Sequence, residues 1–391
     1  MKTQPLFSKE QWAGYALWAI LFVVICLMIA HNPTQRTVSL AYIQAAERFI
    51  EKAPLYEKEG IHGFLYFPHF ALFFCPFAFL APLPREILWR LFSLGLFIGA
   101  IQKVSSSFFP LLKPKAFLYF SLLVMVSAMA SLRNGQTNLA LAAVLLLAFV
   151  SCGEKKWIQA AFFFFISLIL KPIALYPFLY AAFFFPAFRK TALATILLFI
   201  LFPFLFSLND LHYVYEQYLL FFKRMLTVSQ PTEANFADIQ GLLFAFSVKL
   251  SSSLSLLIRL LGAIGTILLG MAFDKKNPSL FSVLLYSFST AYLLLFNPRT
   301  ELNSYVFLGL SMAFFSLYFL STEKKQKAAF LFILLTPLLG IEALGGTFVR
   351  LGLWLKPAIC LFVQSLLVFL LIKKRLCCPL PSNPDREPPF L

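Results

Sequence analysis

The feature that most constrains this 391-residue chain is its repeated apolar runs, many of about 18 or more residues, found along its whole length. Such runs are typical of helices that cross a lipid bilayer. A closed β-barrel also spans a bilayer, but its strands would read as short alternating segments. Because these runs are continuous, the sequence predicts an all-α polytopic membrane protein.

Between 11 and 13 spans are expected, as judged from about 20 residues per span. They form a single membrane domain over residues 1–375, followed by a disordered cytoplasmic tail over 376–391. The candidate spans are residues 11–30, 67–82, 86–103, 116–131, 137–151, 157–170, 173–187, 191–207, 254–273, 278–296, 303–320, 327–342 and 353–372.

The net charge of +16 is explained by membrane topology rather than by nucleic-acid binding. Lys and Arg gather in short clusters between apolar runs, as expected of cytoplasmic loops. This predicts a cytoplasmic N-terminus and places several polar breaks together on the outer face, namely residues 31–70, 133–138, 170–172, 208–253, 297–303 and 345–352. When spans are counted from the N-terminus, Lys113 and Lys115 fall on the outer face of the membrane. When spans are counted back from the GEKK cluster at 153–156, the same residues fall on the cytoplasmic face. One stretch between residues 67 and 131 is therefore expected to be half-buried or re-entrant.

The two longest outer segments are expected to contain surface helices. In the first, residues 39–52 form an amphipathic pattern that ends at Pro54. Its apolar face would carry Leu40, Ile43, Ala46 and Ile50. In the second, over 208–253, the aromatic first half predicts another surface helix or a lid.

Charged and amide side chains in or beside membrane spans are costly to place, so they are functional candidates. The polar breaks supply Arg133, Asn134, Gln136, Asn138, Lys171, Arg299, Glu301 and Arg350. Two or three cations on one face would suit a phosphate or pyrophosphate headgroup. The alternative is that each cation reaches the interface and meets lipid phosphates; for Lys171 and Arg299 we favour a functional role.

Several classes of chemistry have no support in the sequence. It has no Gly-rich phosphate loop, no His or Cys spacing typical of a metal site and no Ser/His/Asp order. The sequence thus predicts no metal, no cofactor and no cytosolic nucleotide chemistry.

Short motifs in a fixed order resemble glycosyltransferase family 87 over roughly residues 10–310. These integral-membrane enzymes have the C-type glycosyltransferase fold and include polyprenol-phosphate-mannose-dependent α-mannosyltransferases. The matching residues are Tyr42, Ala45 and Ala46, then Pro54, Leu55 and Tyr56, then Tyr66 and Pro68, then Gly135, Gln136 and Asn138, then Lys171 and Pro172, and finally Asn297 and Pro298.

The resemblance implies a C-type helical bundle that moves a hexose, such as mannose, from a polyprenyl-phosphate-linked donor to a glycolipid or glycan acceptor. Transfer would occur at the outer face of a bacterial inner (plasma) membrane, among membrane lipids and without nucleic acid. The family places an Asp base just before the Y-x-x-A-A motif, but this chain has no carboxylate over 37–40. We therefore expect Glu47 as the catalytic base. The expected substrate-binding residues are Tyr42, Tyr56, Tyr66, Arg133, Gln136, Asn138, Lys171, Asn297 and Arg299.

Two alternatives stay open. A transporter or flippase of a lipid-linked substrate would share the apolar composition, although no internal repeat is seen and the polar groups gather at one face. A catalytically inactive member of the same fold would explain the missing Asp.

Overall fold

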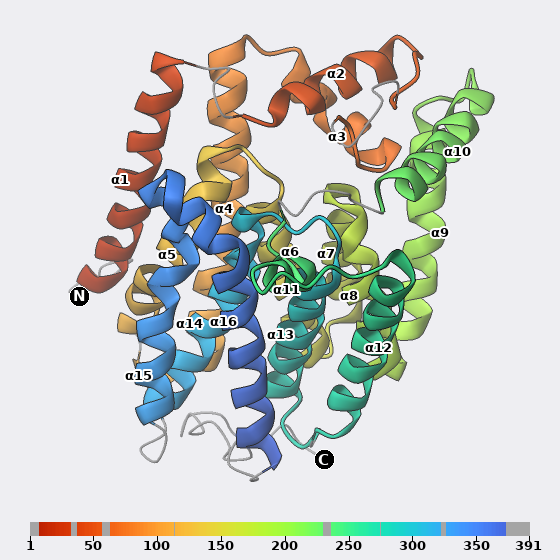
Figure 1. The fold of residues 1–391 in the computed structure, drawn as a ribbon. Helices are drawn as coiled ribbons and strands as arrows, with labels where there is room; N and C mark the ends of the chain where they lie inside the picture. The colour runs from red at the N-terminus through yellow and green to blue at the C-terminus, as the bar shows by residue number, and fades with distance from the viewer. Residues whose placement is uncertain are drawn as a thin grey trace, which may run out of the picture.

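A computed structural model describes residues 8–32, 37–56, 63–112, 114–229, 236–273, 275–321 and 326–372 (Figure 1). These residues form α-helices and short 3-10 helices and contain no β-strand. Nine described segments are long and apolar enough to cross a membrane, and four further apolar helices are shorter. The prediction of an all-α polytopic membrane protein is confirmed. The proposed tail at 376–391 lies outside the described residues.

The bundle is built from helices that run back and forth between an upper end and a lower end (Figure 1). The upper end carries α2 (Ser39–Ile50), α3 (Pro68–Ala78) and α10 (Leu211–Val228); the lower end carries the last residues of α16 (Gly346–Ile372). The other main helices are α1 (Lys9–His31), α4 (Pro82–Phe108), α5 (Lys115–Arg133), α6 (Asn138–Gly153), α7 (Trp157–Leu170), α8 (Leu175–Phe184), α9 (Arg189–Leu205), α12 (Ser252–Met271), α13 (Pro278–Phe296), α14 (Val306–Leu320) and α15 (Gln326–Leu335).

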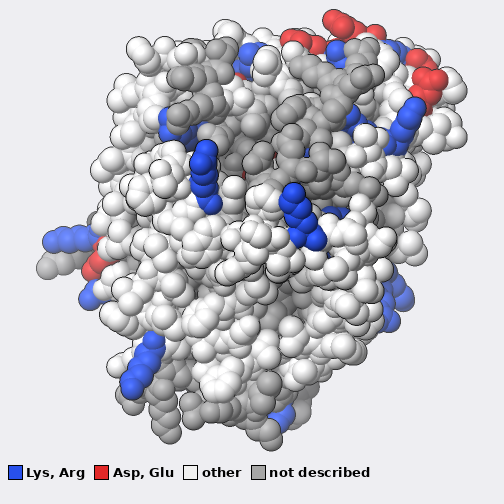
Figure 2. Space-filling model, in the orientation of Figure 1, with Lys and Arg blue, Asp and Glu red and all other residues white. Residues whose placement is uncertain are grey.

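The core of the bundle is formed by α6, α13 and α14, whose side chains are almost all buried. By contrast, α1, α9 and α12 expose many Leu, Ile and Val side chains. Figure 2 shows a surface that is mostly free of charge, with acidic side chains gathered at its upper edge. Apolar helices with exposed apolar faces are expected where lipid is the solvent.

The expected amphipathic helix in the first long break is present as α2, but its buried face differs from the prediction. Ile43 and Ala46 are buried as expected, whereas Leu40 is 56% exposed and Ile50 is 48% exposed. The buried face is instead formed by Tyr42, Ile43, Ala45, Ala46 and Phe49. The reason is that α2 packs on the aromatic helix α3, so ring contacts decide the rotation of the helix rather than aliphatic spacing.

The ambiguity between residues 67 and 131 is resolved by α3, which is too short to span a membrane and lies beneath α2 at the upper end (Figure 1). The chain then descends through α4. Near its start, Glu86 accepts a hydrogen bond from Thr37 at 2.9 Å. Near its end, Lys103 pairs with Glu154 at 2.7 Å. The start of α5 at Lys115 therefore lies at the same end as the GEKK cluster, as basic loops require; Lys113 lies outside the described residues.

The second long break begins with α10, which is N-capped by the Asp210 side chain through the Tyr213 backbone amide. It continues through the short helix α11 (Ile239–Phe244) to α12. The predicted surface helix is therefore found at the upper end.

Candidate functional site

Three tyrosines from the first break meet at the upper end of the bundle. Tyr42 Oη and Tyr66 Oη lie 2.8 Å apart, and Tyr56 donates to the Tyr66 backbone carbonyl at 2.6 Å. Burial raises the pKa of Tyr66 to about 12 and that of Tyr42 well above its ordinary value. Both phenols therefore stay protonated near neutral pH, so they serve as hydrogen-bonding groups and not as bases.

The turn between α5 and α6 needs a glycine. Gly135 has φ = +63°, and a Cβ added there would lie 3.0 Å from the Arg90 guanidinium carbon. The Gly135 carbonyl accepts a hydrogen bond from the Trp89 indole at 2.6 Å. This packing fixes the direction in which Gln136 and Asn138 leave the turn.

Asn138 joins three separate breaks. Its side chain is fully buried, and its Nδ2 donates to Gln136 Oε1 and Asn303 Oδ1, each at 2.8 Å. Its Oδ1 accepts a hydrogen bond from Lys171 Nζ at 2.8 Å. The expected convergence of Gln136, Asn138 and Lys171 is therefore seen.

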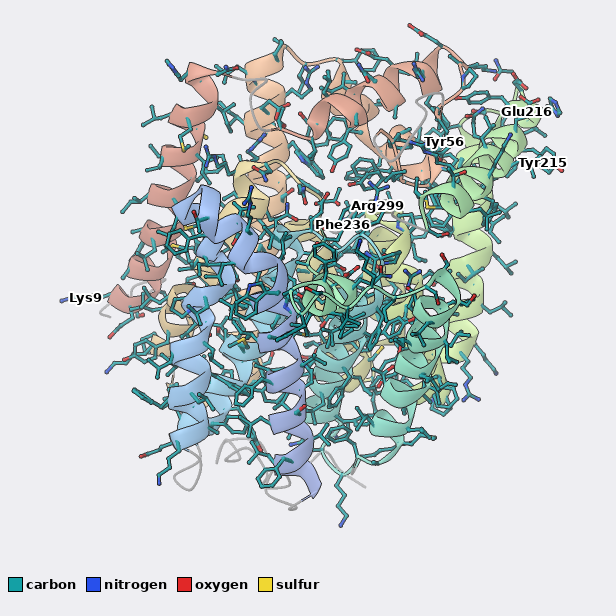
Figure 3. All side chains as sticks on the ribbon, in the orientation of Figure 1. Lys9, Tyr56, Tyr215, Glu216, Phe236 and Arg299 are labelled. Carbon is teal, nitrogen blue, oxygen red and sulfur yellow. The ribbon has the colours of Figure 1, made fainter. Side chains whose placement is uncertain are left out.

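The break at 297–303 also contributes Glu301. Gln136 Nε2 donates to Glu301 Oε2 at 2.7 Å. Glu301 and Arg299 are also close enough to Lys171 to act on its charge: burial lowers the pKa of Lys171, Glu301 opposes that shift and Arg299 adds to it. Arg299 lies over the Phe236 ring, 5.5 Å from its centroid (Figure 3).

Beside this network lies a cavity of about 870 Å³. One part of its wall is apolar and comes from the membrane helices α1, α5 and α16. The other part is polar and belongs to the breaks at the upper end. The apolar wall includes Leu21, Val24, Ile25, Met28, Val126, Met129, Ala130, Val349 and Leu353, and the polar wall includes Thr37, Arg133, Asn134, Gln136, Glu301, Asn303, Glu342 and Arg350.

Not every expected site residue faces this cavity. Arg133 and Gln136 line it, whereas Tyr42, Tyr56, Tyr66, Asn138, Lys171, Asn297 and Arg299 do not. Asn297 ends α13, and its backbone carbonyl accepts a hydrogen bond from the Thr300 hydroxyl at 3.0 Å. Glu47 is an exposed residue of α2 and does not line the cavity.

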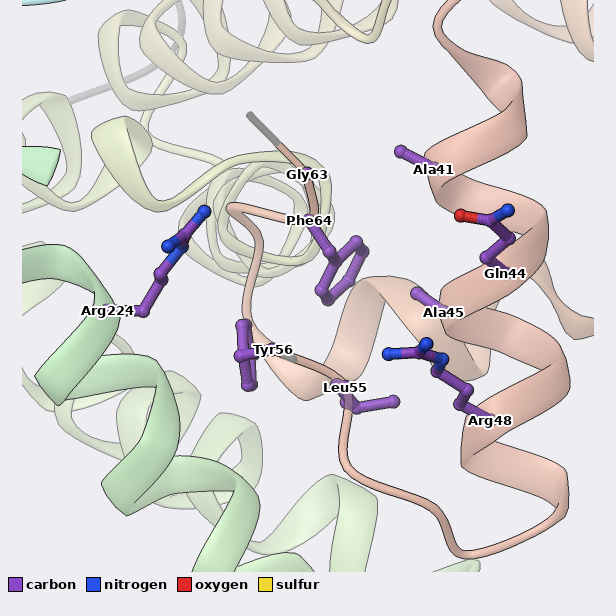
Figure 4. A pocket seen from close by; sticks show the side chains of 9 residues that line it. All are labelled: Ala41, Gln44, Ala45, Arg48, Leu55, Tyr56, Gly63, Phe64 and Arg224. Atoms are coloured by element: carbon purple, nitrogen blue, oxygen red, sulfur yellow. The ribbon is translucent and has the colours of Figure 1, made fainter. Parts of the chain in front are cut away.

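Tyr56 borders a smaller pocket between α2 and α10, where Arg48 and Arg224 lie on opposite sides (Figure 4). This pocket encloses only about 20 Å³. That volume is close to the minimum for a single water molecule, so a sugar does not fit.

Two buried ion pairs near the site were not anticipated. Arg90 Nη1 lies 2.5 Å from Glu86 Oε2, and Lys356 Nζ lies 2.6 Å from Glu342 Oε2. Thr37 and Ser39 both donate to the Glu86 carboxylate, so this carboxylate meets the stretch where the resemblance implies an Asp. The sequence does hold a signal for each pair. Glu86 and Arg90 are four residues apart, one helical turn, and Glu342 and Lys356 are single charges in apolar segments, where a charge is costly unless it is paired.

In the part of the chain that the structure describes, no group of three or more His, Cys, Asp or Glu side chains could hold a metal ion. The polar network therefore consists of amides, phenols, two carboxylates and several cations. Such a set can bind an anionic headgroup, orient a hydroxyl and accept a proton.

A comparison with protein families gives one match: the family model described as glycosyltransferase family 87 matches residues 64–298. This range is more than half of the 391 residues. It contains Tyr66, Gln136, Asn138 and Lys171 and ends just before Arg299 and Glu301. No curated protein matches the chain.

Proposed function

This chain belongs to glycosyltransferase family 87, and from that premise we propose that it transfers a hexose, such as mannose, from a polyprenyl-phosphate donor to a glycolipid or glycan acceptor. The family and the apolar helices make it a membrane glycosyltransferase. The observation that carries the finer proposal is the cavity of about 870 Å³, which is apolar on one side and polar, with two arginines, on the other.

The apolar wall suits an isoprenoid chain. It includes Val24, Ile25 and Met28 of α1 and Val126 and Met129 of α5. A lipid tail there would meet aliphatic side chains at a depth where no water competes. A water-soluble nucleotide sugar would leave this surface without a partner.

Two arginines of the polar wall suit the donor phosphate. Arg133 at the end of α5 and Arg350 near the start of α16 line the same cavity. Guanidinium groups bind phosphate oxygens through paired N–H donors. They would stabilise the charge that develops on the phosphate as it leaves. Lys171, which the sequence suggested for this role, donates to Asn138 and lies outside the cavity wall.

In the reaction, the acceptor hydroxyl oxygen bonds to the anomeric carbon while the bond from that carbon to the phosphate oxygen breaks. The hydroxyl proton passes to a base, and polyprenyl phosphate leaves with the bonding electron pair. No nucleotide and no metal is needed for this balance. The protein supplies orientation, charge stabilisation and the base.

The orientation that we propose puts the upper end outside the cytoplasm of a bacterial inner membrane. Lys103, Lys115 and the GEKK cluster share the lower end with the end of α16. Basic loops are retained in the cytoplasm, so the N-terminus would be cytoplasmic and the cavity's polar wall would face outward.

The test uses the full chain in proteoliposomes with radiolabelled mannosyl polyprenyl phosphate as the probe and a glycolipid extract as the acceptor. We expect label to move into the glycolipid fraction. Arg133→Ala and Arg350→Ala should each lower transfer at least tenfold. Arg189→Ala is the matched control, because Arg189 is exposed and its side chain donates to backbone carbonyls in the last turn of α8.

Absence of transfer from mannosyl and glucosyl polyprenyl phosphates alike would contradict the proposal. Movement of the labelled lipid across the bilayer without sugar transfer would instead identify a flippase.

A further inference from the structure

Among the residues that the structure describes, two carboxylates line the large cavity, Glu301 and Glu342. They differ in their partners. Glu342 is paired with the buried ammonium of Lys356 at 2.6 Å. A carboxylate held in a buried ion pair is a poor proton acceptor, because protonation would leave the lysine charge unpaired.

Glu301 has a different setting. It is an exposed residue at the cavity, and Gln136 is the one described residue that donates a hydrogen bond to its side chain, through Oε2. Its other oxygen, Oε1, accepts no hydrogen bond from the described residues. A carboxylate with one oriented oxygen and one open oxygen has the geometry expected of a general base.

The backbone holds Glu301 firmly in place. The Ser304 amide donates to the Glu301 carbonyl at 3.0 Å, and the Ala237 amide donates to the Thr300 carbonyl at 2.7 Å. The Thr300 hydroxyl also donates to the Leu293 carbonyl at the end of α13. The carboxylate thus stands on a fixed turn between two membrane helices, which suits a reacting group that must be positioned closely.

A directional chain of hydrogen bonds ends at this carboxylate. Lys171 Nζ donates to Asn138 Oδ1, Asn138 Nδ2 donates to Gln136 Oε1, and Gln136 Nε2 donates to Glu301 Oε2. Because an ammonium can only donate, it fixes which amide atom of Asn138 faces it, and hence the orientation of Gln136. The chain runs from a cation to an anion, so each link polarises the next.

The other carboxylates considered for this role are less suitable. Glu47 is an exposed residue of α2 and does not line the cavity. Glu86 is buried and accepts hydrogen bonds from Thr37, Ser39 and Arg90. Its oxygens are therefore already occupied, and it does not line the cavity.

We propose that Glu301 is the catalytic base of the transfer reaction, with Gln136, Asn138 and Lys171 as its positioning residues. The inference rests on the proposed function. Glu301 Oε1 takes the proton of the acceptor hydroxyl as that oxygen bonds to the anomeric carbon and the phosphate oxygen departs. The base of this chain then comes from the break after α13 and not from the first outer break.

The experiment compares Glu301→Gln, Glu301→Asp and the wild type in the proteoliposome assay, with retention of the labelled donor measured in the absence of acceptor. Glutamine keeps the shape and the partner Gln136 but cannot take the proton. We expect Glu301→Gln to lower transfer by about 100-fold or more, within the range of general base catalysis, while donor retention stays within about twofold of the wild type. Glu301→Asp should retain more transfer than Glu301→Gln.

Glu216→Gln is the matched control, since Glu216 is an exposed carboxylate on α10 (Figure 3). If Glu301 is the base, wild-type transfer should fall at acidic pH. The residual transfer of Glu301→Gln should show no such fall.

The outcomes separate the two proposals. If the wild type transfers sugar and Glu301→Gln transfers it within threefold of the wild-type rate, Glu301 is not the base and the proposed function stands. The same holds if Glu47→Gln abolishes transfer with donor retention intact while Glu301→Gln does not. If the wild type transfers no hexose, the proposed function fails and the role of Glu301 fails with it.

Discussion

Glu342, which lines the large cavity, is ion-paired with Lys356, with 2.6 Å between Lys356 Nζ and Glu342 Oε2. The Lys356 side chain is fully buried, and its ammonium also donates to the Leu302 carbonyl at 2.9 Å. Leu302 follows Glu301 directly in the chain. One buried charge pair therefore ties α16 to the turn that carries the proposed base.

Removing one partner of this pair should be strongly destabilising. Lys356→Met leaves the Glu342 charge without compensation, which typically costs about 3–5 kcal/mol. We expect a clear drop in the unfolding temperature of the detergent-solubilised protein, as measured by circular dichroism during heating. The double variant Lys356→Met/Glu342→Gln should recover part of the loss. Equal unfolding temperatures for Lys356→Met and the wild type would show that the pair contributes nothing.

Gly135→Ala should destabilise the turn between α5 and α6. The positive φ at this position costs a non-glycine residue about 1–3 kcal/mol, and the new Cβ would press on the Arg90 guanidinium. We expect a lower unfolding temperature and, because Gln136 follows directly, reduced transfer. Gly95→Ala in α4 is the matched control, since a Cβ there meets nothing within 4 Å. It should be neutral or slightly stabilising, because alanine favours a helix. A harmless Gly135→Ala would exclude this role for the turn.

The pH dependence of transfer should reflect Lys171. Burial disfavours its charged form and lowers its pKa, so the ammonium loses its proton at a lower pH than an ordinary lysine does. Transfer should therefore decline as the pH rises toward that lowered pKa, with no effect of this group at lower pH. Lys171→Arg keeps the charge, so its alkaline decline should move to higher pH. Lys156→Arg, at an exposed position, should leave the profile unchanged. The idea is wrong if Lys171→Arg and the wild type decline together.

Tyr42 and Tyr66 should be energetically coupled. Their hydroxyls lie 2.8 Å apart, and Tyr42 is buried. Tyr66→Phe leaves the Tyr42 hydroxyl without this partner, at a cost of about 1–3 kcal/mol. In a double-mutant cycle of unfolding free energies, Tyr42→Phe/Tyr66→Phe should be less destabilised than the sum of the single variants. Simple additivity would mean that the two hydroxyls do not interact.

Most of the site's convergence could be predicted from the sequence. Gln136, Asn138 and Lys171 lie in polar breaks that alternate topology assigns to one face, and charged or amide groups at such breaks are costly unless they pair. The structure joins them in one hydrogen-bonded chain. The half-buried segment also followed from charge counting, because Lys115 and the GEKK cluster had to share an end.

The parts that were missed depend on side-chain direction. The apolar spacing of α2 suggested Leu40 and Ile50 as buried, but the rings of α3 select Tyr42 and Phe49 instead. Glu47, expected near the site because it lies about one turn beyond Tyr42, is an exposed residue of α2. The partnership of Glu342 with Lys356 spans two segments, and no local pattern links them.

The short helix α3 has a consequence for how the protein is inserted into its membrane. Its 11 residues rise about 16 Å, roughly half of a hydrocarbon core of about 30 Å. An insertion machinery that selects segments by length and apolarity cannot hold such a helix as a span. Its position must come from later packing on α2 and α4. The upper end of the bundle is therefore completed only after the long helix α4 has been inserted into the bilayer.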